Sequence, residues 1–338
     1  MTEDKEPRSE KDRVLQRQIV IETVGACNLR CSMCPTLNYS VGKHMMSEDV
    51  FEKFMKFVMD ESPNISSIDF SGWGEPLLDP GLFEKMAKIR NICSKITLGF
   101  VSNGTLIDDR VVDLINKTEL DYIIISFDGA SEKTYNKIRI GSNFNKVVEG
   151  LGNLSRKKHK NLSLSASFVV MKENINEMEK TVELFERLNF DSIYFKPLNV
   201  ISTRDDIDFI ANQDEILKHF DRIDQDKYSI KIALWGVGAN GLEKNCSANA
   251  AGGAFFINCN GDVAPCCNIG HHVPAYVNHE TGATAIDDCS YFLGNLNETA
   301  LSEILNGAEY RKFLGKFHAG RIPAPCFGCQ LIGSEMKN

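Results

Sequence analysis

Three cysteines near the start of the chain have the spacing that most clearly indicates chemistry. Cys27, Cys31 and Cys34 stand within eight residues, separated by three and then by two residues. Thiolates are soft ligands that bind iron–sulfur clusters or zinc. Three of them in one loop favour a four-iron cluster with one iron left open, because a structural zinc site, the alternative, usually takes cysteine pairs from two places. The run 18–23 reads as a strand, so the loop leaves the end of a strand where α/β barrels keep their chemistry.

Polar segments follow three further runs that read as strands. They are Ser-Gly-Trp-Gly-Glu-Pro at 71–76, Val-Ser-Asn-Gly at 101–104 and Ser-Phe-Asp-Gly at 126–129. Glycine lets a ligand approach the backbone, and Glu75 offers an acceptor. Each segment alone is an ordinary turn, but the strand ends of a barrel meet at one mouth. We therefore expect these residues to lie near the cysteine loop.

A regular alternation of strands and helices carries these motifs. Six strands separated by helices predict a parallel sheet. The expected strands cover 18–23, 66–71, 95–101, 121–127, 163–170 and 191–196. The expected helices cover 47–60, 80–92, 106–118, 143–158 and 175–188. After about residue 200 we expect a helix at 211–224, a strand at 229–233, a Gly/Ala-rich stretch at 236–254, a hairpin around Asn260-Gly261 and a last helix at 298–317.

The Cys-x3-Cys-x2-Cys loop resembles the cluster loop of the radical S-adenosylmethionine (radical SAM) enzymes. The resemblance implies that the open iron binds the amino and carboxylate groups of SAM, which is then cleaved to methionine and a 5′-deoxyadenosyl radical. It also implies the fold class α/β, with a partial (β/α)6 barrel over residues 18–235 that follows a flexible N-terminus, 1–17.

The segments at the strand ends resemble the SAM-binding motifs of that family. By this resemblance Met33 lies near the adenine, where an aromatic residue is more usual, and the motif of Glu75 binds the SAM amino group. Arg139 matches an arginine that pairs with the SAM carboxylate, as a planar guanidinium does well. Lys196 is either near the substrate or a solvated lysine. The implied cofactor-binding residues are Met33, Gly72, Trp73, Gly74, Glu75, Ser102, Asn103, Ser126, Asp128 and Arg139.

Eight cysteines lie outside the first loop, and four of them could close a second site. Four thiolates can hold either a [4Fe–4S] cluster or zinc. Their order resembles the SPASM and twitch extensions of radical SAM enzymes, over residues 236–338. Full SPASM domains hold two auxiliary clusters, but a later cysteine run is missing here, so we expect one. Its implied ligands are Cys246, Cys266, Cys326 and Cys329.

The other cysteines have less defined roles. Cys93 reads as a small buried hydrophobe. Either Cys259 or Cys289 could replace one of the four ligands. Cys267, next to a ligand, is either a packed thiol or a hydrogen-atom donor.

The resemblance extends to radical SAM enzymes that act on aminocyclitols and aminoglycosides, such as 2-deoxy-scyllo-inosamine dehydrogenase. It implies hydrogen abstraction from a carbinol carbon of a sugar or aminocyclitol, and oxidation to a ketone with the auxiliary [4Fe–4S] cluster as electron acceptor. The alternatives are an epimerase with Cys267 as catalytic hydrogen donor, and a SPASM maturase that modifies a peptide. A non-enzymatic iron–sulfur or zinc protein would require the ordered motifs to be accidental.

The composition sets outer limits on these functions. The 338 residues are 43% hydrophobic and 25% charged, as in ordinary soluble globular proteins. A net charge of −8 disfavours nucleic acid and anionic membranes as partners. The hydrophilic segment 1–17 is no signal peptide, and eleven cysteines in such a chain suggest metal ligands, so we expect a cytoplasmic protein. The expected partners are a small-molecule substrate and an external electron donor such as flavodoxin or ferredoxin.

Overall fold

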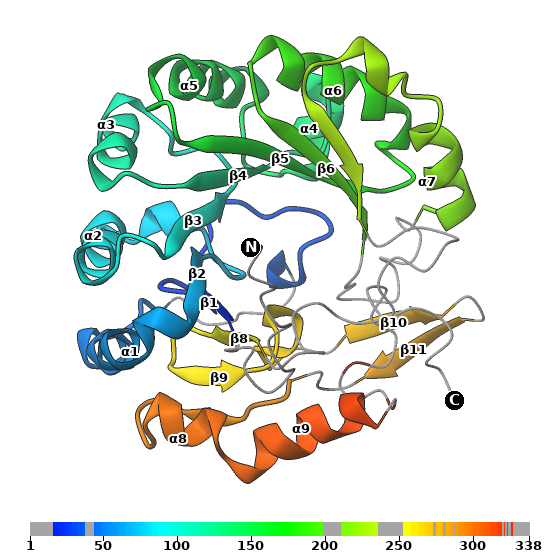
Figure 1. Cartoon of the computed structure of the whole chain (residues 1–338). Coiled ribbons are helices and arrows are strands. Elements are labelled where there is room, and N and C mark those ends of the chain that lie inside the picture. The colour runs from blue at the N-terminus through cyan, green and yellow to red at the C-terminus, as the bar shows by residue number, and fades with distance from the viewer. Residues whose placement is uncertain are drawn as a thin grey trace, which may run out of the picture.

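The structure is a computed structural model in which a curved sheet carries helices on its outer side (Figure 1). It describes residues 16–37, 44–198, 211–235, 253–272, 275–279, 282–286, 288, 290–319, 321, 323 and 326. Predictions that concern Cys246, Cys289, Cys329, most of the N-terminus and the Gly/Ala-rich stretch up to 252 lie outside the described residues.

The predicted parallel sheet is present, with seven parallel strands in the barrel part. In chain order they are β1 (Arg17–Ile21), β2 (Ile65–Phe70), β3 (Thr97–Ser102), β4 (Tyr122–Ser126), β5 (Ser163–Val170), β6 (Ser192–Pro197) and β7 (Lys231–Leu234). Each pairs in parallel with the next. The α/β fold class is therefore confirmed, and the strand predicted near 229–233 joins the sheet as a seventh member.

The outer helices cover the side of the sheet that faces away from the curve (Figure 1). In chain order they are α1 (Glu48–Glu61), α2 (Leu82–Ile92), α3 (Asp109–Thr118), α4 (Glu132–Ile138), α5 (Phe144–Lys157), α6 (Met178–Arg187) and α7 (Gln213–Phe220). Side-chain caps begin several of them, because Ser47, Asp108 and Asn143 each accept a hydrogen bond from the backbone N–H three residues on. Helix α4 was not predicted from the sequence, because it is only two turns long.

The strands alternate between an apolar outer face and a polar inner face. Ile68, Phe70, Leu98 and Phe100 are at most 1% exposed and belong to the main core. The intervening residues point to the other side of the pleat, into the curve. A parallel sheet is usually apolar on both faces, so a polar inner face indicates that the inside of the barrel receives a ligand.

The C-terminal part extends the same sheet beyond β1. Strand β8 (Ala254–Ile257) pairs in parallel with β1, and β9 (Asp262–Ala264) pairs with β8 through the predicted hairpin. Gly261 takes the left-handed φ of +87° that this turn requires. Strand β12 (Gly294–Asn295) then pairs with β9.

The C-terminal part differs from the prediction at its last helix and contains a second pair of strands that was not predicted. The last helix is broken at Asn306-Gly307 into α8 (Leu301–Leu305) and α9 (Ala308–His318). The unpredicted strands are β10 (Ala275–His279) and β11 (Gly282–Ile286), which pair with each other. The two residues between these strands lack the Asn-Gly type of turn signal, which explains the omission.

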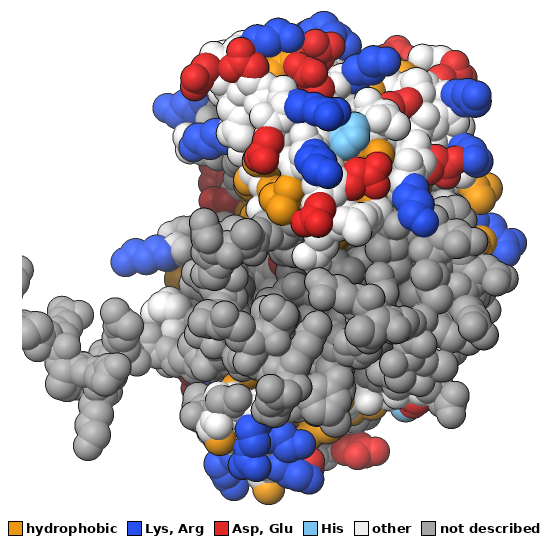
Figure 2. Space-filling view, turned by 90° about the vertical axis from the view of Figure 1, so that its right-hand side faces the viewer, with side chains coloured by type: hydrophobic (Ala, Val, Ile, Leu, Met, Phe, Trp, Pro, Cys, Tyr) orange, Lys and Arg blue, Asp and Glu red, His pale blue; other side chains and the backbone are white. Residues whose placement is uncertain are grey.

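The described surface is mixed in charge. Lys, Arg, Asp and Glu side chains alternate over the upper part of the face in Figure 2. Within the described residues, no helix is both long and apolar enough to cross a membrane.

Candidate active site at the mouth of the barrel

The cysteine loop is anchored to the barrel by apolar packing and by two backbone hydrogen bonds. Residues of the loop pack with residues from the segments after β4, β5 and β6 in a small buried cluster of Leu29, Cys31, Met33, Ile138, Met171 and Leu198. Arg30 N–H donates to the Ile140 carbonyl at 2.9 Å, and Ser32 N–H donates to the Ile138 carbonyl at 2.8 Å. The unpredicted α4 therefore places the segment that holds the loop.

The sulfur atoms of the loop have hydrogen-bond donors around them. Leu29 N–H lies 3.4 Å and Asn103 Nδ2 3.8 Å from Cys27 Sγ, while Arg139 Nη1 lies 3.9 Å from Cys31 Sγ. Burial raises the pKa of Cys31 to about 11, and the guanidinium of Arg139 acts in the opposite direction. Donors directed at thiolates are the usual surroundings of an iron–sulfur cluster.

The thiols fit a cluster better than a single ion. Among the described residues no three His, Cys, Asp or Glu side chains lie close enough together to hold one metal ion. A [4Fe–4S] cluster binds each thiolate to a separate iron and so holds them further apart than zinc would. Cys27, Cys31 and Cys34 are the residues that would hold it.

The glycine-rich segment 71–76 packs directly against the cysteine loop. Glu75 N–H donates to the Ala26 carbonyl at 2.8 Å. A Cβ on Gly74 would lie 1.9 Å from the Val24 carbonyl oxygen, so only glycine fits there. The fit brings two stretches about 50 residues apart in sequence into one wall of the site.

The carboxylate of Glu75 connects this wall to the end of β3. Its two oxygens accept hydrogen bonds from Ser102 Oγ at 2.7 Å and from Asn103 N–H at 2.8 Å. Burial raises the pKa of Glu75, although these bonds oppose the rise. The structure thus brings together Glu75, Ser102, Asn103 and Cys27, four of the residues predicted to surround SAM.

Asp128 and Arg139 form a buried ion pair beside the cysteine loop. Arg139 Nε and Nη2 lie 2.8 and 2.5 Å from Asp128 Oδ2, and Val169 N–H donates to Asp128 Oδ1 at 2.7 Å. Asp128 is fully buried and Arg139 is 7% exposed. Both carboxylate oxygens of Asp128, which was predicted to bind the cofactor, therefore have partners within the protein. Ser126 ends β4 half-buried and in register with Ser167.

The inner face carries a second carboxylate that the sequence analysis missed. Tyr122 hydroxyl donates to Asp69 Oδ2 at 2.6 Å, while Asp69 Oδ1 is buried without a hydrogen bond from any described residue. Tyr122 reaches Asp69 across Gly99, where a Cβ would lie 2.6 Å from the tyrosine ring. Burial raises the pKa of Asp69, against the effect of the Ser71 and Tyr122 hydroxyls. Strand parity was the signal that could have found it, since Asp69 stands between the core residues Ile68 and Phe70.

Lys196 and Cys267 share the electrostatic environment of the inner face. The surrounding protein lowers the pKa of Lys196 by desolvation although the side chain is exposed at the barrel opening, and Asp128 and Cys267 oppose this effect. The pKa of Cys267 is lowered, first by a hydrogen bond with Cys266 and then, against desolvation, by Lys196. Asp69 also acts on Cys267. The predicted hydrogen donor is therefore close to the inner polar groups.

Only part of the predicted auxiliary site lies within the described residues. Cys266 is half-buried and Cys326 is buried against the main core. Cys259 is 3% exposed, and its pKa is raised to about 12 by burial and by the neighbouring carboxylate of Glu22. Cys93 is half-buried at the end of α2.

Comparison with known proteins agrees with this geometry. The Radical SAM superfamily model matches residues 21–185, and the SPASM iron-sulfur cluster-binding domain model matches residues 246–330. A tungsten-containing aldehyde ferredoxin oxidoreductase cofactor-modifying protein of Pyrococcus furiosus is 22% identical over 88% of this chain and 83% of its own. The AdoMet-dependent heme synthase of Methanosarcina barkeri is 24% identical over 93% of this chain and 91% of its own.

A solved structure shares the fold over nearly the same length. Native anSMEcpe with bound AdoMet and Cp18Cys peptide superposes with a TM-score of 0.68 at 18% identity, over 94% of this chain and 88% of that one. The predicted cofactors, SAM and two [4Fe–4S] clusters, are typical of proteins with these two domains. The chain therefore carries a radical SAM domain followed by a C-terminal SPASM iron–sulfur cluster-binding domain.

Proposed function

We propose that the protein is a radical SAM oxidoreductase that oxidises a carbinol carbon of a small polar substrate, such as a sugar or aminocyclitol, to a ketone. The observation that supports it is the polar inner face of the barrel. Asp69 Oδ1 is buried and makes no hydrogen bond with a described residue, while the Tyr122 hydroxyl binds the other oxygen and the Ser71 hydroxyl also acts on the carboxylate. A substrate hydroxyl is the donor that this oxygen lacks.

The reaction balances with Asp69 as proton acceptor. Bound SAM and the first cluster, reduced by an external flavodoxin or ferredoxin, would supply a 5′-deoxyadenosyl radical that takes the hydrogen atom from carbon. The Asp69 carboxylate would accept the hydroxyl proton, and the auxiliary cluster, when bound, would supply the acceptor for the remaining electron. Because burial raises the pKa of Asp69, its carboxylate is a stronger base than an exposed aspartate.

The residues around the cysteine loop would hold SAM and the first cluster. Cys27, Cys31 and Cys34 would bind iron, with Asn103 and Arg139 donating toward the sulfurs. Two N–H groups of Arg139 are occupied by Asp128, so a SAM carboxylate would meet Nη1. Such oxygen-sensitive chemistry suits the cytoplasm.

A peptide substrate is the second candidate. Its support is the structure of anSMEcpe with bound AdoMet and Cp18Cys peptide, whose fold this chain shares. Epimerisation is the third, with Cys267 returning a hydrogen atom to carbon. These outcomes differ in the mass of the product, so one assay separates them.

The first experiment tests radical SAM activity itself. The chain is reconstituted anaerobically with iron and sulfide and incubated with SAM and dithionite. Wild type should release 5′-deoxyadenosine, and the variant with Cys27, Cys31 and Cys34 all changed to Ala should release none while keeping its auxiliary iron. Formation of 5′-deoxyadenosine by the triple variant would refute the assignment of the first cluster.

The second experiment identifies the outcome. The enzyme is incubated in deuterium oxide with a panel of aminocyclitols, aminoglycosides and peptides. A product two mass units lighter supports the proposal, deuterium at carbon without oxidation supports the epimerase, and a modified peptide supports the maturase. Asp69→Asn should slow oxidation at least about 100-fold but leave SAM cleavage intact. Tyr122→Phe, which keeps the carboxylate, should lose much less.

A further inference from the structure

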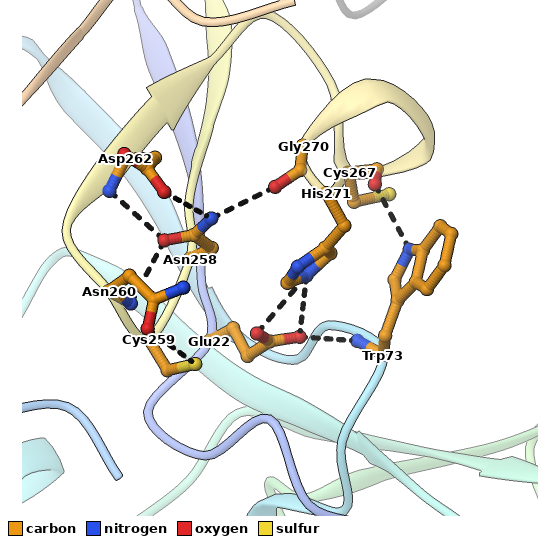
Figure 3. A network of polar contacts seen from close by, with 9 residues as sticks. All are labelled: Glu22, Trp73, Asn258, Cys259, Asn260, Asp262, Cys267, Gly270 and His271. Atoms are coloured by element: carbon orange, nitrogen blue, oxygen red, sulfur yellow. Dashed lines mark hydrogen bonds and ion pairs between the residues drawn. The ribbon is translucent and has the colours of Figure 1, made fainter. Parts of the chain in front are cut away.

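A buried carboxylate at the end of β1 joins the two halves of the chain. Glu22 is 2% exposed and follows β1 directly. Its Oε2 accepts a hydrogen bond from Trp73 N–H at 2.6 Å, and His271 Nε2 lies 3.2 Å from each of its two oxygens. Figure 3 shows the three side chains meeting between the first barrel strands and the C-terminal segment. His271 stands 249 residues from Glu22 in sequence.

The barrel side of this contact is shaped to fit Glu22. A Cβ on Gly72 would lie 2.2 Å from Glu22 Oε2, so the glycine lets the backbone close on the carboxylate. The next residue, Trp73, donates from its indole Nε1 to the Cys267 carbonyl at 3.0 Å. Its ring lies 5.0 Å from the ring of His271. Trp73 therefore contacts both the carboxylate and the C-terminal segment.

The C-terminal side is equally constrained. His271 is 3% exposed, and its ring also packs 5.7 Å from Phe256 of β8. The Asn258 side chain donates to the carbonyl of Gly270, the residue before His271, at 3.0 Å (Figure 3). Gly270 itself is pressed on the Phe256 ring, which a Cβ would approach to 2.3 Å. The segment thus has a defined place relative to β8 as well as to Trp73.

We propose that Glu22, Trp73 and His271 form a positioning unit that holds the Cys266–Cys267 segment against the loop 71–76. This inference rests on the proposed function in two respects only. It takes the loop 71–76 as part of the SAM site, and it takes Cys266 as a ligand of the auxiliary cluster with Cys267 next to it. A radical formed beside the loop 71–76 and an electron acceptor or hydrogen donor at Cys266 or Cys267 must stay at a fixed distance from each other. The unit supplies that separation, because Trp73 donates to the Cys267 carbonyl and His271, four residues further on, contacts both Glu22 and Trp73.

Thiol alkylation of the cluster-free protein tests the unit without SAM or turnover. The rate at Cys267 is measured with iodoacetamide by peptide mass spectrometry, with fragment ions separating it from Cys266. Trp73→Phe keeps an aromatic ring but removes the indole donor, and His271→Phe removes the donor to Glu22. Each should raise the Cys267 rate about tenfold, the effect of losing one good hydrogen bond that keeps a segment closed. His271→Gln, which retains a donor, should stay within about twofold of wild type.

Matched variants and a third thiol provide the controls. Trp235→Phe and His272→Phe make the same changes at exposed side chains outside the unit, and should leave the Cys267 rate unchanged. Cys93, at the end of α2, reports the general fold.

The double variant separates one unit from independent contacts. If Trp73 and His271 act together, Trp73→Phe with His271→Phe should alkylate only as fast as the faster single variant, whereas independent contacts would multiply their effects. An unchanged Cys267 rate in both single variants, or a multiplicative double variant, would overturn the proposal. If His271→Phe also makes Cys93 reactive, that variant has lost its general fold. The Cys267 alkylation rate of Trp73→Phe alone then decides whether the proposal stands. Loss of 5′-deoxyadenosine formation, in contrast, bears only on the proposed function.

Discussion

Replacing Asp128 by Asn should destabilise the protein strongly, because it leaves the Arg139 guanidinium buried without its counter-charge. Asp128 is fully buried, and Arg139 is 7% exposed with two nitrogens 2.8 and 2.5 Å from one carboxylate oxygen. Breaking a buried ion pair by removing one partner costs about 3–5 kcal/mol. At about 2–4 °C per kcal/mol for a large domain, the melting temperature should fall by roughly 6–20 °C.

The geometry shows that this cost is electrostatic. Val169 N–H donates to the other oxygen, Asp128 Oδ1, at 2.7 Å, and the carbonyl of an Asn can still accept that bond. The Asn side chain lacks the negative charge that faces Arg139, and it places an amide N–H toward the guanidinium instead. The single variant therefore removes the charge and keeps the contact to β5.

A double-mutant cycle in the cluster-free protein provides the measurement. Wild type, Asp128→Asn, Arg139→Met and the double variant are unfolded in urea and followed by circular dichroism. The double variant removes both charges. Its loss in free energy of unfolding should therefore be at least about 2 kcal/mol smaller than the summed losses of the two single variants. A cost below about 1 kcal/mol for Asp128→Asn, or strictly additive effects, would show that the pair is not the buried bridge described here.

Three further predictions concern two glycines and the buried contacts of Glu177. Gly72→Ala should weaken SAM binding to the reconstituted enzyme at least about tenfold by equilibrium dialysis, because its Cβ would lie 2.2 Å from Glu22 Oε2. Gly315→Ala in α9, where a Cβ meets nothing within 4 Å, should instead stabilise the fold by about 0.5–1 kcal/mol in urea unfolding. The pKa of Glu177 is lowered because hydrogen bonds from Thr134, Ser131 and nearby backbone N–H groups outweigh the effect of burial. Glu177→Gln should therefore lower the free energy of unfolding by its full amount at pH 7, and this loss should shrink as the pH falls below about 4.5. Denaturation at pH 7 and at a pH below about 4.5 measures the difference.

The sequence predicted the parts of the site that depend on local pattern. The cysteine spacing, the strand before it and the glycine-rich segment 71–76 are each readable over a few residues, and they meet because parallel strands end at one edge. The partner of Asp128 was not readable in this way. Arg139 lies just after α4, a helix too short to show a clear period, and the sequence offers no sign that the guanidinium turns to the carboxylate rather than to a ligand.

Long-range packing accounts for the rest. Glu22, near the end of the first predicted strand, carries no motif of its own, and its partner His271 stands in a stretch for which no element or role was predicted. Their contact depends on β8 pairing with β1, which no local pattern specifies. Asp69 was not predicted for a different reason. The sequence shows that it stands between two apolar residues of a strand, but only the folded sheet shows that its face of the strand is the inside of the barrel.

The pairing of β8 with β1 gives the two predicted cluster regions a common support. The strands are parallel and in register, with Ile21 opposite Ile257 and Glu22 N–H donating to the Ile257 carbonyl at 2.8 Å. Parallel strands finish at the same edge, so the chain leaves β1 toward the cysteine loop and leaves β8 toward the turn 258–261 from neighbouring points. Cys266 follows after β9 has run back antiparallel to β8 in the same sheet. A separate domain joined by a linker would let the distance between these regions vary. Here one continuous sheet fixes where both chains emerge, and the buried contacts of Glu22 act just beyond that edge, where a small displacement would alter both sites.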